Sequence, residues 1–127
     1  MRTTQPPLFS PETEWVMPDE LKDLTHYKEI AVDLETYDPD LTTSGSGNVV
    51  GNGHIAGIAL AVEGWSGYYP IGHENGGNMD TTLVFSWLRD LFKDPNKTFI
   101  FHNAMYDVCW LRSNGMHIAG KVVDTMI

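Results

Sequence analysis

The chain alternates between short apolar runs and polar, glycine-rich segments, and the spacing of the apolar positions changes along it. Residues 29–36, EIAVDLET, alternate apolar and polar side chains, which predicts a half-buried strand. The runs 54–63 and 66–72 are rich in Ala, Ile, Val and Tyr and flank a Gly-Trp turn, so they predict a β-hairpin. Residues 37–53 are rich in Gly, Ser, Thr, Asn and Asp, and we expect an exposed loop there whose role the sequence leaves open.

The second half of the chain changes to a helical spacing. Asp80, a residue type favoured at helix N-caps, precedes apolar positions that recur every three or four residues, which predicts an amphipathic helix. Its apolar positions are Leu83, Val84, Trp87, Leu88, Leu91 and Phe92. Residues 98–102 predict a buried strand, 103–115 a second helix that stops at its final glycine, and the region around Val122 a last short strand.

This order of elements predicts the fold class. Three strands followed by helix, strand, helix and strand indicate an α/β domain, a mixed sheet with helices on its faces. At 127 residues the chain is expected to form one domain. Residues 1–26 contain four of the seven prolines and no sustained period, so we expect an extended lead-in with one helical turn near 18–24, and a domain over residues 27–127.

Composition narrows the class of protein further. The net charge is −9, which argues against broad electrostatic binding to nucleic acid phosphates, so any such contact should be local or mediated by cations. Cys109 is the one cysteine, which excludes an intrachain disulfide and fits a reducing compartment. No signal-peptide pattern and no apolar run of about 18 residues is present, so we expect an intracellular protein that does not enter a membrane.

Several familiar catalytic and binding motifs are missing. No G-x-S-x-G, C-x-x-C or H-E-x-x-H pattern occurs, and the five histidines are scattered, which disfavours a serine triad or a zinc site. The stretch that starts at Asp38 and Asp40 begins like a calcium loop but has Thr43 at position six and Val49 at position twelve, so it predicts a solvated loop.

The remaining candidates for chemistry are carboxylates. Asp33 and Glu35 lie two apart on the first predicted strand and therefore on one face, where they are either a surface pair or ligands for a cation. Asp107 lies four residues after Asn103 on the second predicted helix, so both project from one face near its start. Asn103 is also a plausible N-cap. Three converging acids would need divalent cations, and oxygen-only ligands suit Mg²⁺ or Mn²⁺.

Two blocks of the sequence carry a family resemblance. AVDLET at 31–36, followed by HNAMYDVCWLRSNGMHIAGKVVDTMI at 102–127, resembles the first two motifs of the DEDD 3′-5′ exonucleases, specifically the proofreading domain of family A DNA polymerases, including viral ones. The resemblance covers residues 28–127. It implies a ribonuclease H-like fold with a five-stranded mixed sheet and hydrolysis of the 3′-terminal phosphodiester of DNA by two metal ions, Mg²⁺ or Mn²⁺.

The resemblance also implies roles for single residues. Asp33 would bridge both ions, Glu35 would bind the ion that holds the nucleophilic water, and Asp107 would act on the second ion. Asn103 and Tyr106 would orient the terminal nucleotide, while the Thr36 backbone would contact its sugar end. Tyr106 also fits a packing role on the helix. The implied partners are a single-stranded 3′ end of DNA and a polymerase domain, in a phage-like protein that acts inside a bacterial host.

The sequence departs from the family pattern at its end. The third motif, a Tyr or His followed four residues later by the last catalytic Asp, is not among these residues, so we expect a C-terminally truncated site that binds metal weakly and cleaves poorly. Asp124 is expected to cap a third helix and not to bind metal. Two alternatives stay open, a non-catalytic ribonuclease H-like module that binds nucleic acid or protein and a related exonuclease acting on RNA.

Overall fold

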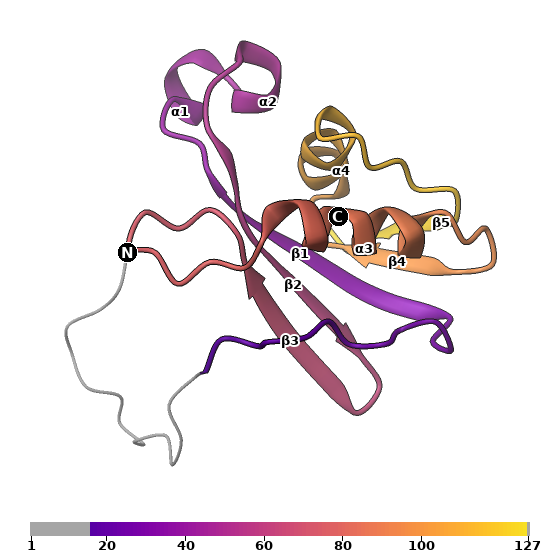
Figure 1. The fold of residues 1–127 in the computed structure, drawn as a ribbon. Coiled ribbons are helices and arrows are strands. Elements are labelled where there is room, and N and C mark those ends of the chain that lie inside the picture. Colours follow the sequence, from indigo (N-terminus) through magenta and orange to yellow (C-terminus); the bar gives the residue numbers. More distant parts are fainter. Residues whose placement is uncertain (1–15, 127) are drawn as a thin grey trace, which may run out of the picture.

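A computed structural model describes residues 16–126, which form a twisted sheet with helices packed against it (Figure 1). The strands are β1 (Glu29–Tyr37), β2 (His54–Val62), β3 (Trp65–Pro70), β4 (Thr98–Phe101) and β5 (Lys121–Asp124). Their order in the sheet is β3-β2-β1-β4-β5. β1, β2 and β3 pair antiparallel, whereas β4 runs parallel to both β1 and β5. The predicted mixed five-stranded sheet is therefore confirmed.

In the described part of the chain, four helices accompany the sheet, namely α1 (Leu41–Ser44), α2 (Gly47–Val50), α3 (Thr81–Phe92) and α4 (Ala104–Ser113). The core-facing stripe of α3 consists of Val84, Leu88, Leu91 and Phe92, all buried. The predicted cap is confirmed, because the Asp80 carboxylate accepts hydrogen bonds from the backbone amides of Thr82 and Leu83. Leu83 is 56% exposed, against its predicted place in the stripe, since it is rotated by about 100° from Val84 around the helix.

The hairpin of β2 and β3 differs from the prediction at its turn. Trp65 pairs with Val62 and begins β3, so the turn consists of Glu63 and Gly64. Gly64 has φ +83°, a conformation that favours glycine in a two-residue hairpin turn. The turn that was expected at Gly-Trp therefore lies one residue earlier.

The segment 37–53 is not a plain loop, because α1 and α2 each form one helical turn beyond the ends of β1 and β2 (Figure 1). The Asp38 carboxylate holds this segment together by accepting a hydrogen bond from the Gly47 amide at 2.9 Å. A Cβ at position 47 would collide with the Asn52 carbonyl oxygen, so the close turn requires glycine there. Because this contact is tertiary, composition alone could not distinguish the two helical turns from a loop.

The described part of the lead-in packs against the domain. Leu24 is buried in the core, and residues 18–24 contain no helix, contrary to the predicted turn. The buried Lys97 ammonium donates to the backbone carbonyls of Leu24, Thr25 and Tyr27 at 3.2, 2.8 and 2.6 Å. The Leu24 carbonyl also accepts a hydrogen bond from the Tyr27 amide at 3.2 Å, so the segment turns at residues 25 and 26 and directs these carbonyls toward Lys97. Residues 1–15 of the expected lead-in lie outside the described residues.

Candidate active site

Two of the three predicted carboxylates, Asp33 and Asp107, lie near each other where β1 loses its pairing with β4. The two strands pair only from Glu29 to Ala31, so the edge of β1 is open beyond that point. Helix α4 follows β4 directly and places Asp107 in its first turn, where the carboxylate accepts a hydrogen bond from the Leu34 amide at 3.3 Å. Asp107 thereby satisfies a donor on the open edge and lies beside Asp33.

The acidic set consists of Asp33, Glu35 and Asp107. Of these, the first two are exposed, and Asp107 is buried, with 4% of its surface exposed. Burial raises the pKa of its carboxyl to about 6, the Leu34 hydrogen bond opposes this rise, and the charges of Asp33 and Asp124 add to it. Within residues 16–126, the two ion pairs join Lys93 to Asp90 and Lys97 to Asp94, so neither involves this acidic set. A buried carboxylate beside another acid, with no protein cation, is a favourable position for a bound cation.

Glu35 lies on the same face of β1 as Asp33 but turns toward β3. The Tyr68 hydroxyl donates to the Glu35 carboxylate at 3.3 Å and lies 2.6 Å from Nε2 of His73. Burial raises the pKa of Tyr68, and the charge of Glu35 raises it further, so the hydroxyl is protonated at neutral pH. The Tyr68 hydroxyl is therefore a hydrogen-bond donor to Glu35 at neutral pH.

Tyr106 connects α4 with the end of β1 and with the loop beyond it. Its hydroxyl donates to the Asp38 carboxylate at 2.7 Å and lies 2.8 Å from the Thr36 hydroxyl. Because a tyrosine has one hydroxyl proton, Thr36 donates to Tyr106. Burial raises the pKa of Tyr106. The structure thus brings Thr36 and Tyr106 together, as two residues predicted to act on the same end of a substrate.

Asn103 lies at the N-cap position of α4 but does not cap it with its side chain. Its φ of +68° is the one positive value among the non-glycine residues from 16 to 126. The Asp124 carboxylate accepts hydrogen bonds from the amides of Asn103 and Ala104, both at 3.0 Å. Asp124 ends β5, and its carboxylate also accepts a hydrogen bond from the Met126 amide at 2.9 Å. The predicted third helix lies outside the described residues, so that cap stays a prediction, whereas the contact with α4 was not expected. The exposed Asn103 side chain is left available for another contact.

The chemistry of these donors fits a hard divalent cation, because all three carboxylates supply oxygen ligands. Their arrangement fits less completely. From residue 16 to residue 126, no group of three or more His, Cys, Asp or Glu side chains is arranged so that it could hold a metal ion. Asp33 is close enough to Asp107 for its charge to raise the pKa of Asp107, whereas Glu35 is hydrogen-bonded to Tyr68. The described residues therefore bring together part of a metal site.

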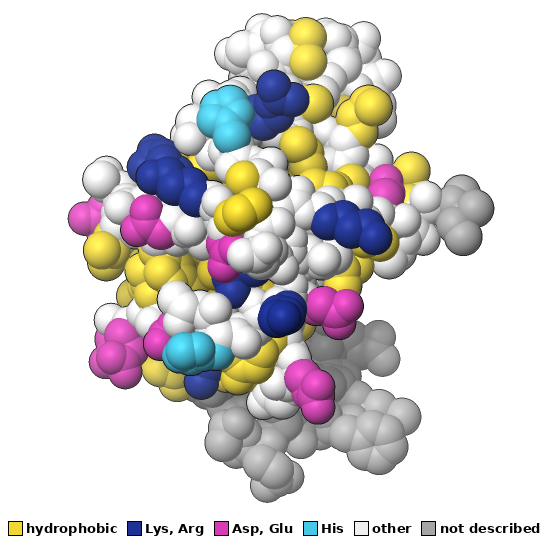
Figure 2. Space-filling view, turned by 90° about the vertical axis from the view of Figure 1, so that its right-hand side faces the viewer, with side chains coloured by type: hydrophobic (Ala, Val, Ile, Leu, Met, Phe, Trp, Pro, Cys, Tyr) yellow, Lys and Arg dark blue, Asp and Glu magenta, His cyan; other side chains and the backbone are white. Residues whose placement is uncertain are grey.

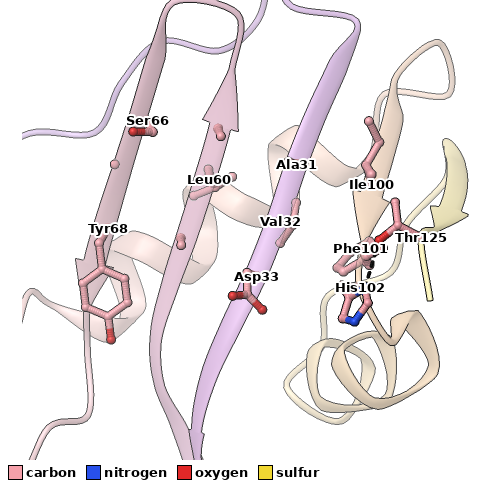
Figure 3. A pocket seen from close by; sticks show the side chains of 13 residues that line it. Ala31, Val32, Asp33, Leu60, Ser66, Tyr68, Ile100, Phe101, His102 and Thr125 are labelled. Carbon is pink, nitrogen blue, oxygen red and sulfur yellow. Dashed lines mark hydrogen bonds between the residues drawn. The ribbon is translucent and has the colours of Figure 1, made fainter. Parts of the chain in front are cut away.

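A cavity of about 660 Å³ lies over the sheet next to these acids. Figure 3 shows Asp33 on β1, with Tyr68 of β3 on one side and His102, which follows β4, on the other. The floor is made of small side chains, among them Ala31, Ala59 and Ser66. On the face in Figure 2, Lys and Arg side chains are separated by acidic and hydrophobic ones and form no continuous basic patch.

Sequence reasoning missed three contributors to the site, namely Asp38, Tyr68 and His73. The turn predicted at Gly-Trp would have placed Tyr68 opposite Ala61, on the correct face of the sheet, whereas the observed turn places it opposite Ala59. The pairing of β2 with β1, which brings Tyr68 near Glu35, carries no local signal. Asp38 was assigned to a solvated loop, and only the tertiary structure shows its bond to Tyr106.

The fold places Asp33 and Asp107 at the open edge of β1, and comparison with known proteins identifies the family. The sequence profile of the 3′-5′ exonuclease family matches residues 10–127, and this chain belongs to that family. A DNA-directed DNA polymerase of Pseudomonas phage M6 is 39% identical over 122 residues, a match that covers 91% of this chain. The chain spans 18% of the length of that polymerase.

Solved structures agree on the fold. The catalytic core of RRP6 from Trypanosoma brucei superposes with a TM-score of 0.54 at 22% identity, covering 78% of this chain and 23% of that one. NrnC from Brucella melitensis gives a TM-score of 0.51 at 20% identity, covering 79% and 43%, and a second NrnC structure contains bound Mg²⁺. The predicted ribonuclease H-like fold is confirmed. In the described residues, no helix is long and apolar enough to cross a membrane.

Proposed function

We propose that this chain is the first part of a proofreading 3′-5′ exonuclease domain, which removes the 3′-terminal nucleotide of DNA by metal-dependent hydrolysis. One observation carries the proposal beyond family membership. Asp107 is a buried carboxylate beside Asp33, and no ion pair of the described residues neutralises either group. Such an arrangement is costly unless a cation binds, so it supports a function in which a cation does bind.

Asp33, Glu35 and Asp107 are the proposed ligands, and the proposed ions are Mg²⁺ or Mn²⁺. When bound, two such ions supply an activated water and stabilise the leaving 3′ oxygen. Asp107 contributes from a rigid position, because its carboxylate is held by the Leu34 amide. Glu35 is exposed, and the hydrogen bond from Tyr68 that links it to β3 is long, at 3.3 Å, so its carboxylate can adjust toward an ion.

Thr36, Asn103 and Tyr106 are the proposed contacts to the terminal nucleotide. Tyr106 is held by Thr36 and Asp38, so its ring has one orientation at the end of β1. A fixed aromatic ring offers a stacking surface that does not depend on base identity. Asn103 projects from the start of α4 and is exposed, which leaves its amide available to the substrate.

The proposed partners are a frayed single-stranded 3′ end of DNA and a polymerase domain in a longer protein. The phage polymerase to which the chain is 39% identical is more than five times as long as the matched part, which supports this arrangement. We propose that such a protein acts inside an infected bacterial cell. The acidic charge of −9 fits a module whose substrate is drawn in by bound cations and by neighbouring domains.

Calorimetric titration of the chain with MnCl₂ tests this function. The unaltered chain is expected to bind weakly, because the third family motif is not among its residues, and Asp33→Ala is expected to abolish the binding heat. Asp90→Ala removes an exposed acid of α3 and serves as the matched control, with binding unchanged. A parallel assay follows the shortening of 5′-labelled DNA and RNA strands as 3′ nucleotides are released, with slow release from DNA expected.

Each outcome bears on the proposal. Equal heats for the unaltered chain and Asp33→Ala would overturn the assignment of the metal site and favour a non-catalytic module. Release from RNA but not from DNA would overturn the proposed substrate. Fast release by this chain would contradict the expectation that a fourth acid is needed.

A further inference from the structure

Tyr68 and His73 lie outside the proposed set of metal ligands, but hydrogen bonds link them to one of those ligands, Glu35. Tyr68 on β3 reaches Glu35 on β1, although β2 lies between these strands. Figure 3 shows the Tyr68 ring lying over the sheet on the same side as Asp33. A tyrosine that crosses a whole strand to contact one carboxylate needs a clear path over that strand.

Gly57 on β2 provides the path. Gly57 pairs with Glu35, so a side chain at position 57 would project from the same face of the sheet. A Cβ there would overlap the Tyr68 hydroxyl and ring edge. Its φ is not positive, so the glycine is required by the close approach of Tyr68 and not by backbone conformation.

The other partner of Tyr68 is also fixed in place. His73 begins the polar turn after β3, where its amide donates to the Asn78 side chain at 2.8 Å and its carbonyl accepts from the Asn78 amide group at 2.9 Å. The turn is tied to the sheet by Ala56, whose carbonyl accepts from the amides of Ile71 and Gly72. Ala56 is the extra residue of a β-bulge, which lies opposite the step from Glu35 to Thr36.

We infer that Tyr68 and His73 are positioning residues that hold the Glu35 carboxylate ready to bind metal. This inference rests on the proposed function. Tyr68 donates its single proton to Glu35, so His73 must donate from Nε2 to the Tyr68 oxygen. The 2.6 Å contact is the short one and fixes the Tyr68 ring, while the 3.3 Å contact lets Glu35 adjust as it binds an ion.

The hydrogen bond from Tyr68 reduces the number of rotamers that the Glu35 side chain samples. An exposed glutamate on a strand samples many rotamers, and binding a metal selects one of them. A hydrogen bond to the oxygen that does not ligate reduces this loss and orients the other oxygen. Partners of this kind in metalloproteins typically change metal affinity by about ten- to a hundredfold.

The first test compares two tyrosines on β3. Tyr68→Phe removes the hydroxyl that contacts Glu35 and is expected to weaken MnCl₂ binding by about tenfold. Tyr69→Phe is the matched control, because the Tyr69 hydroxyl faces the Lys22 amide and not the acids, so binding should not change. Melting temperatures without metal separate folding from binding, and only the Mn²⁺-induced shift should fall in Tyr68→Phe.

The second test asks whether the effect passes through Glu35. In a Glu35→Gln background, Tyr68→Phe should have no further effect on MnCl₂ affinity, because the group that it positions has been altered. His73→Leu should weaken binding as Tyr68→Phe does, and His73→Gln should restore it by returning a donor near the Nε2 position. If Tyr68 and His73 only stabilised the fold, His73→Gln would not restore MnCl₂ binding, and the effect of Tyr68→Phe would not depend on Glu35.

The failures are distinguishable. No binding by the unaltered chain, or binding that survives Asp33→Ala, would overturn the proposed function and this inference with it. Binding that is lost in Asp33→Ala but unchanged in Tyr68→Phe would overturn the positioning role alone. Gly57→Ala provides an independent check, since it displaces Tyr68 without altering any hydrogen-bonding group, and unchanged affinity in a folded Gly57→Ala protein would also overturn it.

Discussion

At the scale of single residues, the two nearby acids Asp33 and Asp107 differ strongly in their exposure to solvent. Asp33 is exposed on β1, whereas Asp107 is 4% exposed and has a pKa raised to about 6. Two carboxylates in such unlike surroundings would give the proposed metal site one rigid and one adaptable ligand. The cost of burying Asp107 is a stability cost that a bound cation would offset.

Asp107→Asn should therefore stabilise the metal-free protein at pH 7. The pKa is raised from 3.8 in the unfolded state to about 6 in the folded state, so the folded protein binds more protons and loses stability as the pH rises between these values. The Asn variant lacks this loss, and its free energy of unfolding should exceed that of the unaltered protein by about 2 kcal/mol above pH 6.5.

Urea denaturation in EDTA at pH 4 and pH 7 measures this difference. The two proteins should converge toward pH 4, and Asp90→Asn on the exposed face of α3 should show no such trend. With MnCl₂ present the order should reverse, because only the unaltered protein gains stability from binding. A lower stability of Asp107→Asn in EDTA at pH 7 would contradict the account.

At the scale of secondary structure elements, two contacts between distant segments position the site. Asp124 at the end of β5 caps α4, and Lys97 before β4 holds the carbonyls of residues 24–27. Neither contact is local in sequence, so neither helix propensity nor periodicity indicates it. Both decide where Asp107 and β1 lie relative to each other.

Asp124→Ala should loosen the first turn of α4. Hydrogen bonds from the amides of Met126, Ala104 and Asn103 lower the pKa of Asp124, so its contribution is present above pH 3.8 and is lost as the pH falls through the lowered value. The variant should melt at a lower temperature at pH 7, and the difference should shrink below pH 3.8. Hydrogen exchange of residues 104–107 should be faster at pH 7, and unchanged exchange there would argue against the cap.

Lys97→Met should destabilise the protein by about 3 kcal/mol, because three backbone carbonyls lose the ammonium group that they share in a buried place. Lys93→Met removes an exposed ammonium of the same region and should change stability little. Thermal denaturation measures both. Equal melting temperatures for the two variants would show that Lys97 does not hold the lead-in.

At the scale of the whole molecule, the net charge sets how nucleic acid is approached. The charge is −9, and no continuous basic patch is visible in Figure 2. Long-range attraction to phosphates is therefore weak, and binding has to depend on the local site.

Binding of single-stranded DNA should accordingly require a divalent cation. Fluorescence anisotropy with a 3′-labelled strand should show binding in MnCl₂ and none in EDTA, with a salt slope of no more than about 2 in magnitude. Asp33→Ala should abolish the Mn²⁺-dependent part. Tight, strongly salt-dependent binding in EDTA would contradict this expectation and would indicate phosphate contacts elsewhere on the surface.

The sequence by itself determined the elements and the candidate ligands. Alternation predicted β1 around Asp33 and Glu35, helical periodicity predicted α3, a glycine stop marked the end of α4, and the spacing of the two motifs identified the family. These signals are local, because strand and helix patterns repeat every two or three to four residues.

The tertiary structure alone decided which residues meet. The open edge of β1 brings Asp107 to Leu34, the register of three strands brings Tyr68 to Glu35, and the end of β5 brings Asp124 to α4. Such contacts join residues that are 20 to 73 positions apart. Their energies depend on burial and strand register, which no short stretch of sequence encodes.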